Sequence, residues 1–287
     1  MKLVNIKVGE EIHLGIKMNK GIIDISLLSN KHGYDLPCTM EEVIKNKKQA
    51  VAEIEKMLKK EQQQIKEDDI IYAPSIINPG KILCIGLNYK NHSEEFHAEV
   101  PKVPVVFSKS NNTLAAHKQT IPLSKHAKQF DYEAELVIVI GRQASNVSRE
   151  DALSYVFGYT VGNDLTARDI QFITGQWFLG KSLDLFGPIG PCIITSDEIN
   201  PNNLEIKSEI NGEVRQLANT GNMIFDCADI ISYISTYITL NPGDIIFTGT
   251  PGGVILGYEK EKQIWLKAGD EIKVTIENIG TLINVLN

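Results

Sequence analysis

The chain has 287 residues, of which 36 are acidic and 29 are basic, so its formal net charge is −7. Such an acidic chain lacks the basic surface that nucleic-acid binding needs, and we expect no nucleic-acid partner. Hydrophobic residues make up 43% and charged residues 23% of the sequence, which is typical of a folded globular protein. The longest apolar runs fall far short of the roughly 20 residues of a membrane helix, so we expect no membrane association.

The N-terminal residues and the cysteines indicate where the protein resides. Charged residues begin at Lys2, and no apolar segment of the kind found in signal peptides follows. The four cysteines are scattered without a C-x-x-C pair, which is typical of reduced thiols and not of a disulfide framework. We therefore expect a cytoplasmic protein.

The first part of the chain has the pattern of a small separate unit. Alternating apolar stretches predict strands at residues 4–8, 12–16 and 22–25. Thr39 with Glu42 forms a capping-box pattern, and helical spacing of apolar residues predicts a helix that continues to Leu58. The charged segment 59–69 either connects two domains or extends that helix. We predict a small β-rich N-terminal domain over residues 1–70 and a larger domain over residues 71–287.

The larger unit is predicted to contain many short strands and few helices. The clearest strand covers residues 132–141, and others are expected at residues 81–86, 245–247 and 271–277. Helices are expected after Ser148 and over the apolar stripe between residues 224 and 238. This pattern predicts an α+β, β-dominated fold.

Two acidic side chains in the clearest strand are the first candidates for chemistry. Glu133 and Glu135 are two residues apart, so a strand places both on one face. Neighbouring carboxylates repel each other, and burial raises that cost unless a cation compensates. Oxygen ligands favour Mg²⁺, Mn²⁺ or Ca²⁺ over Zn²⁺. A solvent-facing edge of a half-exposed strand explains this pattern equally well.

A third carboxylate, that of Asp164, follows the apolar stretch 158–162. If this stretch pairs with the strand of Glu133 and Glu135, Asp164 completes a site of three carboxylates. Asp164 alternatively caps a following turn or helix. If a helix does follow, Arg168 lies on the same face as Asp164 and suits a substrate carboxylate. A structural ion pair of Arg168 with Asp164 or Asp169 is the alternative.

Three further positions carry weaker signals. His92 and Glu95 are three residues apart, which makes them neighbours on a helix and a candidate general base. A solvated helix face is the alternative. Lys181 taken alone has the pattern of a surface charge. Thr250 lies in a glycine-rich turn whose N–H groups and hydroxyl can meet an anion, although the turn lacks the P-loop pattern.

In chain order these segments resemble the motifs of the fumarylacetoacetate hydrolase family. The matching segments are N-Y-x-x-H-x-x-E at 88–95, F-S-K at 107–109, E-x-E at 133–135, N-D-x-T-A-R-D at 163–169, G-K-S at 180–182 and T-G-T-P-G-G at 248–253. The resemblance extends from about residue 81 to 257. It implies a mixed β-roll catalytic domain, a small accessory N-terminal domain and a homodimer. It also implies Mg²⁺ or Mn²⁺ held by Glu133, Glu135 and Asp164, with Ca²⁺ as a non-native occupant.

The resemblance further implies roles for the remaining residues. His92 and Glu95 would belong to a lid over the substrate and act with Lys181 in catalysis, whereas Arg168, Gln171 and Thr250 would bind an oxo acid. The implied reaction is metal-dependent hydrolysis of a carbon–carbon bond in a 2-oxo or β-diketo acid of the acylpyruvate type. Decarboxylation of oxaloacetate and isomerase or lyase reactions are alternatives on the same site. A metal-dependent binding protein without catalysis is a more distant alternative.

Overall fold

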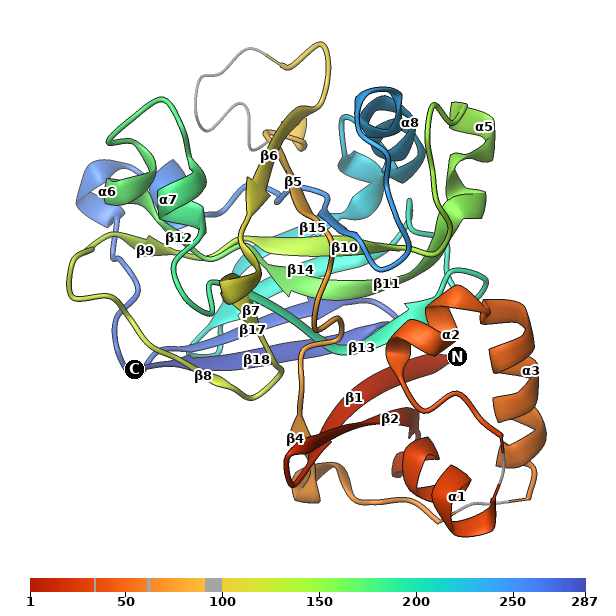
Figure 1. The fold of residues 1–287 in the computed structure, drawn as a ribbon. Helices are drawn as coiled ribbons and strands as arrows, with labels where there is room; N and C mark the ends of the chain where they lie inside the picture. Colours follow the sequence, from red (N-terminus) through yellow and green to blue (C-terminus); the bar gives the residue numbers. More distant parts are fainter. Residues whose placement is uncertain (34, 61–62, 91–99) are drawn as a thin grey trace.

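The structure is a computed structural model that describes residues 1–33, 35–60, 63–90 and 100–287, and its fold is β-dominated α+β (Figure 1). The predicted fold class is therefore confirmed. The strands of the large sheet are β1 (Lys2–Val8), β2 (Glu11–Met18), β3 (Gly21–Asp24), β4 (Ile71–Tyr72), β5 (Ile82–Gly86), β6 (Val105–Lys109), β7 (Leu114–Ala115), β10 (Ala134–Ile140), β11 (Val156–Asn163), β13 (Gly187–Thr195) and β16 (Ile245–Phe247).

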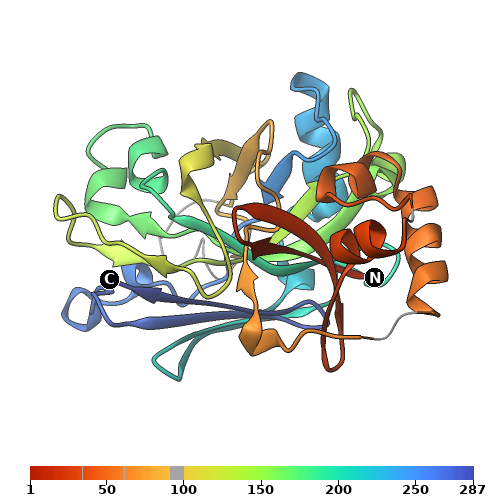
Figure 2. The same cartoon turned by 60° about the horizontal axis from the view of Figure 1, so that its bottom comes forward.

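Two smaller sheets complete the strand structure. One of them contains β8 (Thr120–Ile121), β14 (Glu205–Ile210), β15 (Glu213–Asn219), β17 (Glu271–Ile276) and β18 (Gly280–Leu286). The other contains β9 (Phe130–Asp131) and β12 (Thr166–Ala167). Strands β14 and β17 contact β10 and β11, so the five-stranded sheet lies against the large one, as Figure 2 shows from below.

The helices are short and lie around the sheets. The α-helices are α1 (Ile25–His32), α2 (Met40–Lys45), α3 (Lys47–Leu58), α5 (Arg149–Ala152), α6 (Arg168–Gln171), α7 (Phe178–Lys181) and α8 (Cys227–Tyr237). The 3₁₀ turns are η1 (Glu67–Asp69), η2 (Asn111–Thr113), η3 (Leu153–Tyr155), η4 (Thr220–Asn222), η5 (Ile255–Gly257) and η6 (Lys260–Lys262). Within the described ranges, no helix has the length and apolar character needed to cross a membrane.

The N-terminal strands continue the large sheet. Strand β1 is hydrogen-bonded antiparallel to β13, with Lys2 opposite Ile194 and Leu3 opposite Ile193. Side chains of β1–β3, α2 and α3 share one apolar core with residues of β5, β10 and β16. The N-terminal unit is therefore joined to the rest of the chain by both hydrogen bonds and packing. The boundary near residue 70 stays a prediction.

Two local expectations for the N-terminal unit were wrong. The sequence predicts a strand through residue 25, but Asp24 ends β3 and accepts a hydrogen bond from Leu27 N at 2.8 Å, which begins α1. The helix expected from Thr39 to Leu58 is divided into α2 and α3 at Asn46, whose backbone departs from helical geometry. The capping box of Thr39 and Glu42 is present as predicted.

The central strand β10 has both faces buried. Leu136, Ile138 and Ile140 belong to the apolar core on one side, and Val137 and Val139 belong to the core on the other. Strand β10 lies between β11 and β16 in the large sheet. The alternative interpretation of this segment as a half-exposed edge strand is therefore wrong, and any carboxylate at its beginning is held inside the protein.

Candidate active site

The two central strands β10 and β11 bring the three acidic residues together. They pair antiparallel, with Ala134 opposite Asn163 and Glu135 opposite Gly162, so the beginning of β10 lies beside the end of β11. Glu133 immediately precedes β10 and Asp164 immediately follows β11. The pairing on which the three-carboxylate site depends is therefore present, and its register places the acids next to one another.

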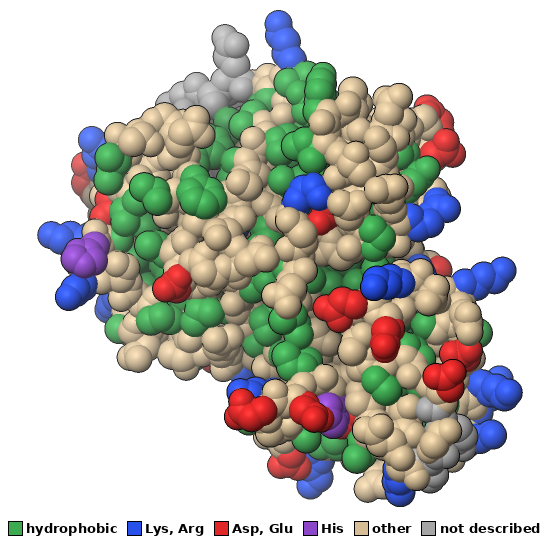
Figure 3. Space-filling model, viewed as in Figure 1, with side chains coloured by type: hydrophobic (Ala, Val, Ile, Leu, Met, Phe, Trp, Pro, Cys, Tyr) green, Lys and Arg blue, Asp and Glu red, His purple; other side chains and the backbone are tan. Residues whose placement is uncertain are grey.

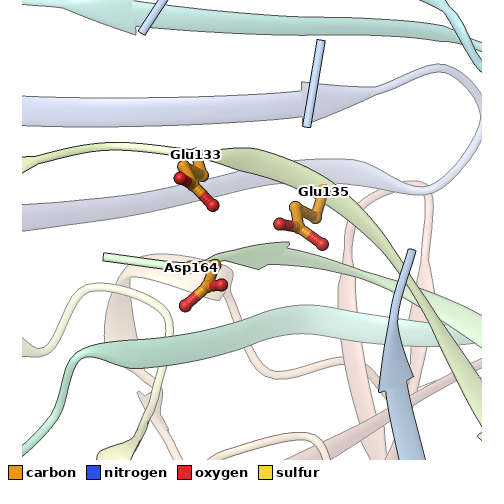
Figure 4. Close-up of side chains that lie close together, drawn as sticks. All are labelled: Glu133, Glu135 and Asp164. Carbon is orange, nitrogen blue, oxygen red and sulfur yellow. The ribbon is translucent and has the colours of Figure 1, made fainter. Parts of the chain in front are cut away.

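The carboxylates of Glu133, Glu135 and Asp164 form a compact buried cluster (Figure 4). Each offers an oxygen within 4.8 Å of those of the other two. The residues are 6%, 1% and 0% exposed, respectively. Burial raises the pKa of Glu135 well above its usual range, and the charges of Asp164 and Glu133 raise it further. The cluster therefore resists full ionisation unless a cation neutralises it.

Three cationic side chains contact two of the three acids. Lys181 Nζ lies 2.7 Å from Glu133 Oε2 and 2.9 Å from Asp164 Oδ2. Lys109 Nζ lies 2.6 Å from Asp164 Oδ1, and Arg168 Nη2 lies 2.7 Å from Glu133 Oε1. Burial alone would lower the pKa of Lys181, but the neighbouring Asp164 and Glu133 outweigh this effect and raise it. Lys181 is thus a buried ammonium ion and not the surface charge that its pattern alone suggests.

Glu135 is held in a different way. Its Oε2 accepts a hydrogen bond of 2.6 Å from Gly249 N in the glycine-rich turn after β16. Gly249 has a φ of 97°, a backbone conformation that favours glycine. In the turn that contains Thr250, the N–H of Gly249 therefore binds a carboxylate of the protein itself, that of Glu135. Thr250 Oγ1 accepts a hydrogen bond of 2.8 Å from Gln216 Nε2.

The environment of Arg168 corrects two expectations. Arg168 is the first residue of α6, and the N-terminal flanking residue of that helix is Ala167, so Asp164 neither caps α6 nor shares a helical face with Arg168. The ion-pair partners of Arg168 are Asp131 and Glu133 instead of Asp164 or Asp169. The strand β12 intervenes between Asp164 and α6, and this turn of the chain was not evident from the sequence.

Asp131 is a site residue that the sequence reasoning missed. It is fully buried, and its Oδ2 lies 2.9 Å from Arg168 Nε. Its carboxylate also accepts hydrogen bonds from Ile255 N at 2.9 Å and Leu256 N at 3.0 Å. The sequence contained a signal for this residue, because Asp131 lies two positions before Glu133 and has the same alternate spacing as Glu133 and Glu135. Lys109 lies in the F-S-K motif but was given no role, and Gln216 was missed. Nothing close to either residue in the sequence points to its partner, Asp164 for Lys109 and Thr250 for Gln216.

A cavity of about 170 Å³ opens beside this cluster. Its polar lining residues are Glu133, Arg168, Gln171, Lys181 and Thr250. Its remaining lining residues are Ile85, Gly86, Leu87, Phe107, Phe172, Trp177 and Leu256. Gln171 Oε1 accepts a hydrogen bond of 3.0 Å from Arg168 Nη1, so the two predicted substrate-binding residues are directly linked. The predicted catalytic residues His92 and Glu95 lie outside the described residues.

The donor set fits a hard divalent cation. The described network contains four buried carboxylates, those of Asp131, Glu133, Glu135 and Asp164, and three cations, those of Lys109, Arg168 and Lys181. It is therefore left with one net negative charge when all groups are ionised. A divalent cation held by Glu133, Glu135 and Asp164 would leave one positive charge, which suits an anionic substrate. The metal type stays open between Mg²⁺ and Mn²⁺.

Comparison with known proteins establishes the class to which this fold and site belong. The family profile described as "Fumarylacetoacetate (FAA) hydrolase C-terminal" matches residues 81–287. The chain belongs to this family, as its motifs predict. Members of the family are enzymes and include hydrolases, isomerases and tautomerases.

Individual proteins within this family are similar to the chain in sequence or structure. The chain is 50% identical over 226 residues to the fumarylacetoacetate hydrolase domain-containing protein 2 homolog of Dictyostelium discoideum, covering 75% of this chain and 73% of that protein. It is 37% identical over 279 residues to the mitochondrial oxaloacetate tautomerase Fahd2a of Rattus norvegicus, covering 96% and 87%. The crystal structure of maleylpyruvate hydrolase from Sphingobium sp. SYK-6 with manganese(II) and pyruvate has a TM-score of 0.81 and 28% identity, covering 100% and 98%.

Several expectations are not tested by these observations. The roles of the individual site residues, the homodimer and the cytoplasmic location stay predictions. The same holds for the expected lack of nucleic-acid and membrane partners.

Proposed function

We propose that the protein is a divalent-metal-dependent enzyme that hydrolyses a carbon–carbon bond in an acylpyruvate-type 2-oxo acid. The observation that carries this proposal is the buried cluster of Glu133, Glu135 and Asp164 beside a cavity lined by Arg168 and Lys181. A bound divalent cation would supply Lewis-acid stabilisation of negative charge on the 2-oxo group. The relative whose structure contains manganese and pyruvate supports this choice of ligands.

Side chains of the protein would orient the substrate and stabilise its negative charge in this reaction. Arg168 and Lys181 are fixed by Glu133 and present a positive field to a carboxylate that enters the cavity. Hydrolysis adds hydroxide from water to the distal carbonyl carbon, and the electrons of the broken bond stay with the pyruvate fragment as its enolate. That enolate then takes up a proton to give pyruvate. His92 with Glu95 is our proposed base for the water.

A second candidate is the interconversion of the keto and enol forms of oxaloacetate. It is favoured by the rat relative, whose name specifies an oxaloacetate tautomerase and which aligns with 96% of this chain. Both reactions require the enol or enolate of a 2-oxo acid in the same cavity. Hydrolysis breaks a carbon–carbon bond, whereas tautomerisation breaks none. Oxaloacetate decarboxylation also breaks a carbon–carbon bond, but it releases carbon dioxide and adds no water.

The experiment follows products instead of substrate loss alone. The protein is incubated with Mn²⁺ and either acetylpyruvate or oxaloacetate, with enol absorbance and released pyruvate measured together. Pyruvate and acetate from acetylpyruvate support the hydrolase. Faster loss of oxaloacetate enol without pyruvate supports the tautomerase, and pyruvate from oxaloacetate supports the decarboxylase. Inactivity on a wide panel of oxo acids with intact Mn²⁺ binding would favour a binding protein.

The metal assignment is tested separately by calorimetry. Glu133→Ala and Asp164→Ala are expected to lose Mn²⁺ binding and turnover together, because each removes one of the three carboxylates. The exposed Glu150, at the beginning of α5, provides a matched control as Glu150→Ala. Unchanged Mn²⁺ affinity in the two site variants would contradict the assignment.

A further inference from the structure

The cavity beside the carboxylate cluster has an apolar wall of distinct construction. Trp177 and Phe107 form an edge-to-face pair, with ring centroids 5.3 Å apart and an interplanar angle of 76°. Gly86 lies directly under the indole, since a Cβ placed on it would be 2.7 Å from Cζ3 of Trp177. Strand β5 therefore ends in a glycine that lets the tryptophan ring lie against the backbone. We call Gly86, Phe107 and Trp177 the aromatic wall.

The aromatic wall meets the polar end of the cavity at Lys181. The ammonium group of Lys181 lies 5.3 Å from the centroid of the Phe107 ring, and the same group contacts Glu133. A 2-oxo acid whose carboxylate end lies near Lys181 and Arg168 would therefore extend its other end along the aromatic wall. Ile85 and Leu256 add aliphatic surface to the same cavity.

Among the described residues, the cavity offers no cation for a distal carboxylate apart from the two at its polar end. Its cationic lining residues in that part of the chain are Arg168 and Lys181, and both already pair with Glu133. The single positive charge of the metal-loaded network is balanced by the one carboxylate of a monoanionic 2-oxo acid. A second carboxylate against the aromatic wall would lose water without gaining a counter-ion from the described residues, which is unfavourable. An apolar group gains free energy from the same burial.

The apolar surface continues outward from the cavity. Phe172 lines the cavity and is 54% exposed, and Ile173, Phe178 and Leu179 around it are 73%, 44% and 66% exposed. In Figure 3 hydrophobic side chains gather on the side of the molecule where Figure 1 places α6 and α7. A substituent longer than the cavity therefore still meets apolar surface at its mouth.

From these contacts we infer that the substrate is an acylpyruvate whose acyl group is large and apolar, and that Gly86 and Trp177 determine this specificity. The inference rests on the proposed function, because it takes the carboxylate cluster as the end that binds the 2-oxo acid. It disfavours oxaloacetate, whose distal group is a carboxylate. An aromatic ring is the substituent that best matches the edge-to-face pair of Phe107 and Trp177.

The test compares kcat/KM for benzoylpyruvate, acetylpyruvate and oxaloacetate with Mn²⁺ present. We expect benzoylpyruvate to exceed each of the others at least tenfold, mainly through KM. Trp177→Ala removes the ring, and Gly86→Ala forces it away from the backbone, so both should reduce the ratio of benzoylpyruvate to acetylpyruvate at least fivefold. Gly175→Ala is the matched control, because a Cβ there meets no atom within 4 Å.

A binding measurement separates this inference from the proposed function. Phenylpyruvate, which has the 2-oxo acid and the ring but no bond of the acylpyruvate type, should raise the Tm of the Mn²⁺-loaded protein more than pyruvate or oxaloacetate does. If phenylpyruvate binds in this way but the protein cleaves no acylpyruvate, the specificity of the aromatic wall is supported and the proposed hydrolase activity is contradicted. Equal or stronger binding and turnover of oxaloacetate would overturn the inference. So would a substrate ratio that is the same in Trp177→Ala, Gly86→Ala and the unaltered protein.

Discussion

Replacing Glu135 by glutamine should change stability in opposite directions with and without metal. Glu135 contacts no cation among the described residues and accepts one N–H from Gly249, while Glu133 and Asp164 lie close to it. Without metal, Glu135→Gln removes a source of like-charge repulsion from the cluster. With metal, it removes one of the three carboxylates that would hold the ion.

The size of the repulsion follows from the geometry. Two unit charges that lie within 4.8 Å of each other repel by at least about 3 kcal/mol at an effective dielectric constant of roughly 20. Burial and both neighbours raise the pKa of Glu135, so part of this repulsion is already relieved by protonation. We therefore expect a gain of about 1–2 kcal/mol in the free energy of unfolding near pH 8, or about 2–8 °C in Tm at 2–4 °C per kcal/mol.

Thermal unfolding with EDTA and with saturating Mn²⁺ measures both effects. A ligand at 100 times its Kd stabilises by about 2.7 kcal/mol, and the variant should lose most of this gain. Glu53→Gln is the control, because Glu53 is only partly buried on α3 and its hydrogen bond in the described structure comes from Gln49. Lower stability of Glu135→Gln in EDTA would refute the repulsion argument. A metal-induced shift equal to that of the unaltered protein would refute Glu135 as a ligand.

Three other changes have defined outcomes. Asp131→Asn leaves the buried guanidinium of Arg168 short of a charged partner and should lower the free energy of unfolding in urea by about 3 kcal/mol. Lys109→Met removes one of the two ammonium groups that contact the buried carboxylate of Asp164, so it should destabilise the metal-free protein by a similar amount and raise its affinity for Mn²⁺ in calorimetry. Burial lowers the pKa of His117 from 6.5 to about 4, so the unfolded chain binds this proton more readily and stability falls as pH drops through that window. His117→Gln should remove about 3 kcal/mol of that loss between pH 7.5 and 4 in urea unfolding.

Local sequence patterns predicted the strands that form the centre of the fold. The apolar run at residues 134–140 and the turn before residues 245–247 gave β10 and β16 close to their bounds. The order of strands in the large sheet was not predictable, because β16 pairs with β5 across more than 150 residues of chain, with Ile245 opposite Ile82. Such pairings depend on which surfaces can be buried together, and no local pattern specifies that.

The candidate site was predictable only where its residues share a strand or a strand pair. Glu133 and Glu135 stood out because a strand places them on one face. Asp164 joined them on the condition that the two strands pair, and the structure shows that they pair antiparallel. Their cationic partners come from elsewhere, with Lys109 at the end of β6 and Lys181 at the end of α7. An isolated lysine has the same local pattern whether it lies on the surface or against a buried carboxylate. His92 and Glu95 stay predictions.

Because so many charged side chains are buried together, the site forms only when the surrounding fold is complete. The acids are fixed by β10 and β11, but the cations that make their burial tolerable arrive on β6, α6 and α7. Removing any one partner leaves an uncompensated charge in a low-dielectric interior, which costs more than the pair contributes when it is complete. Asp131, the partner of Arg168, adds β9, so the arrangement exists only when all six elements are in place. Contacts that position Arg168 and Lys181 for an anion are consequently also contacts on which stability depends, so substitutions of these two residues should lower activity and stability together.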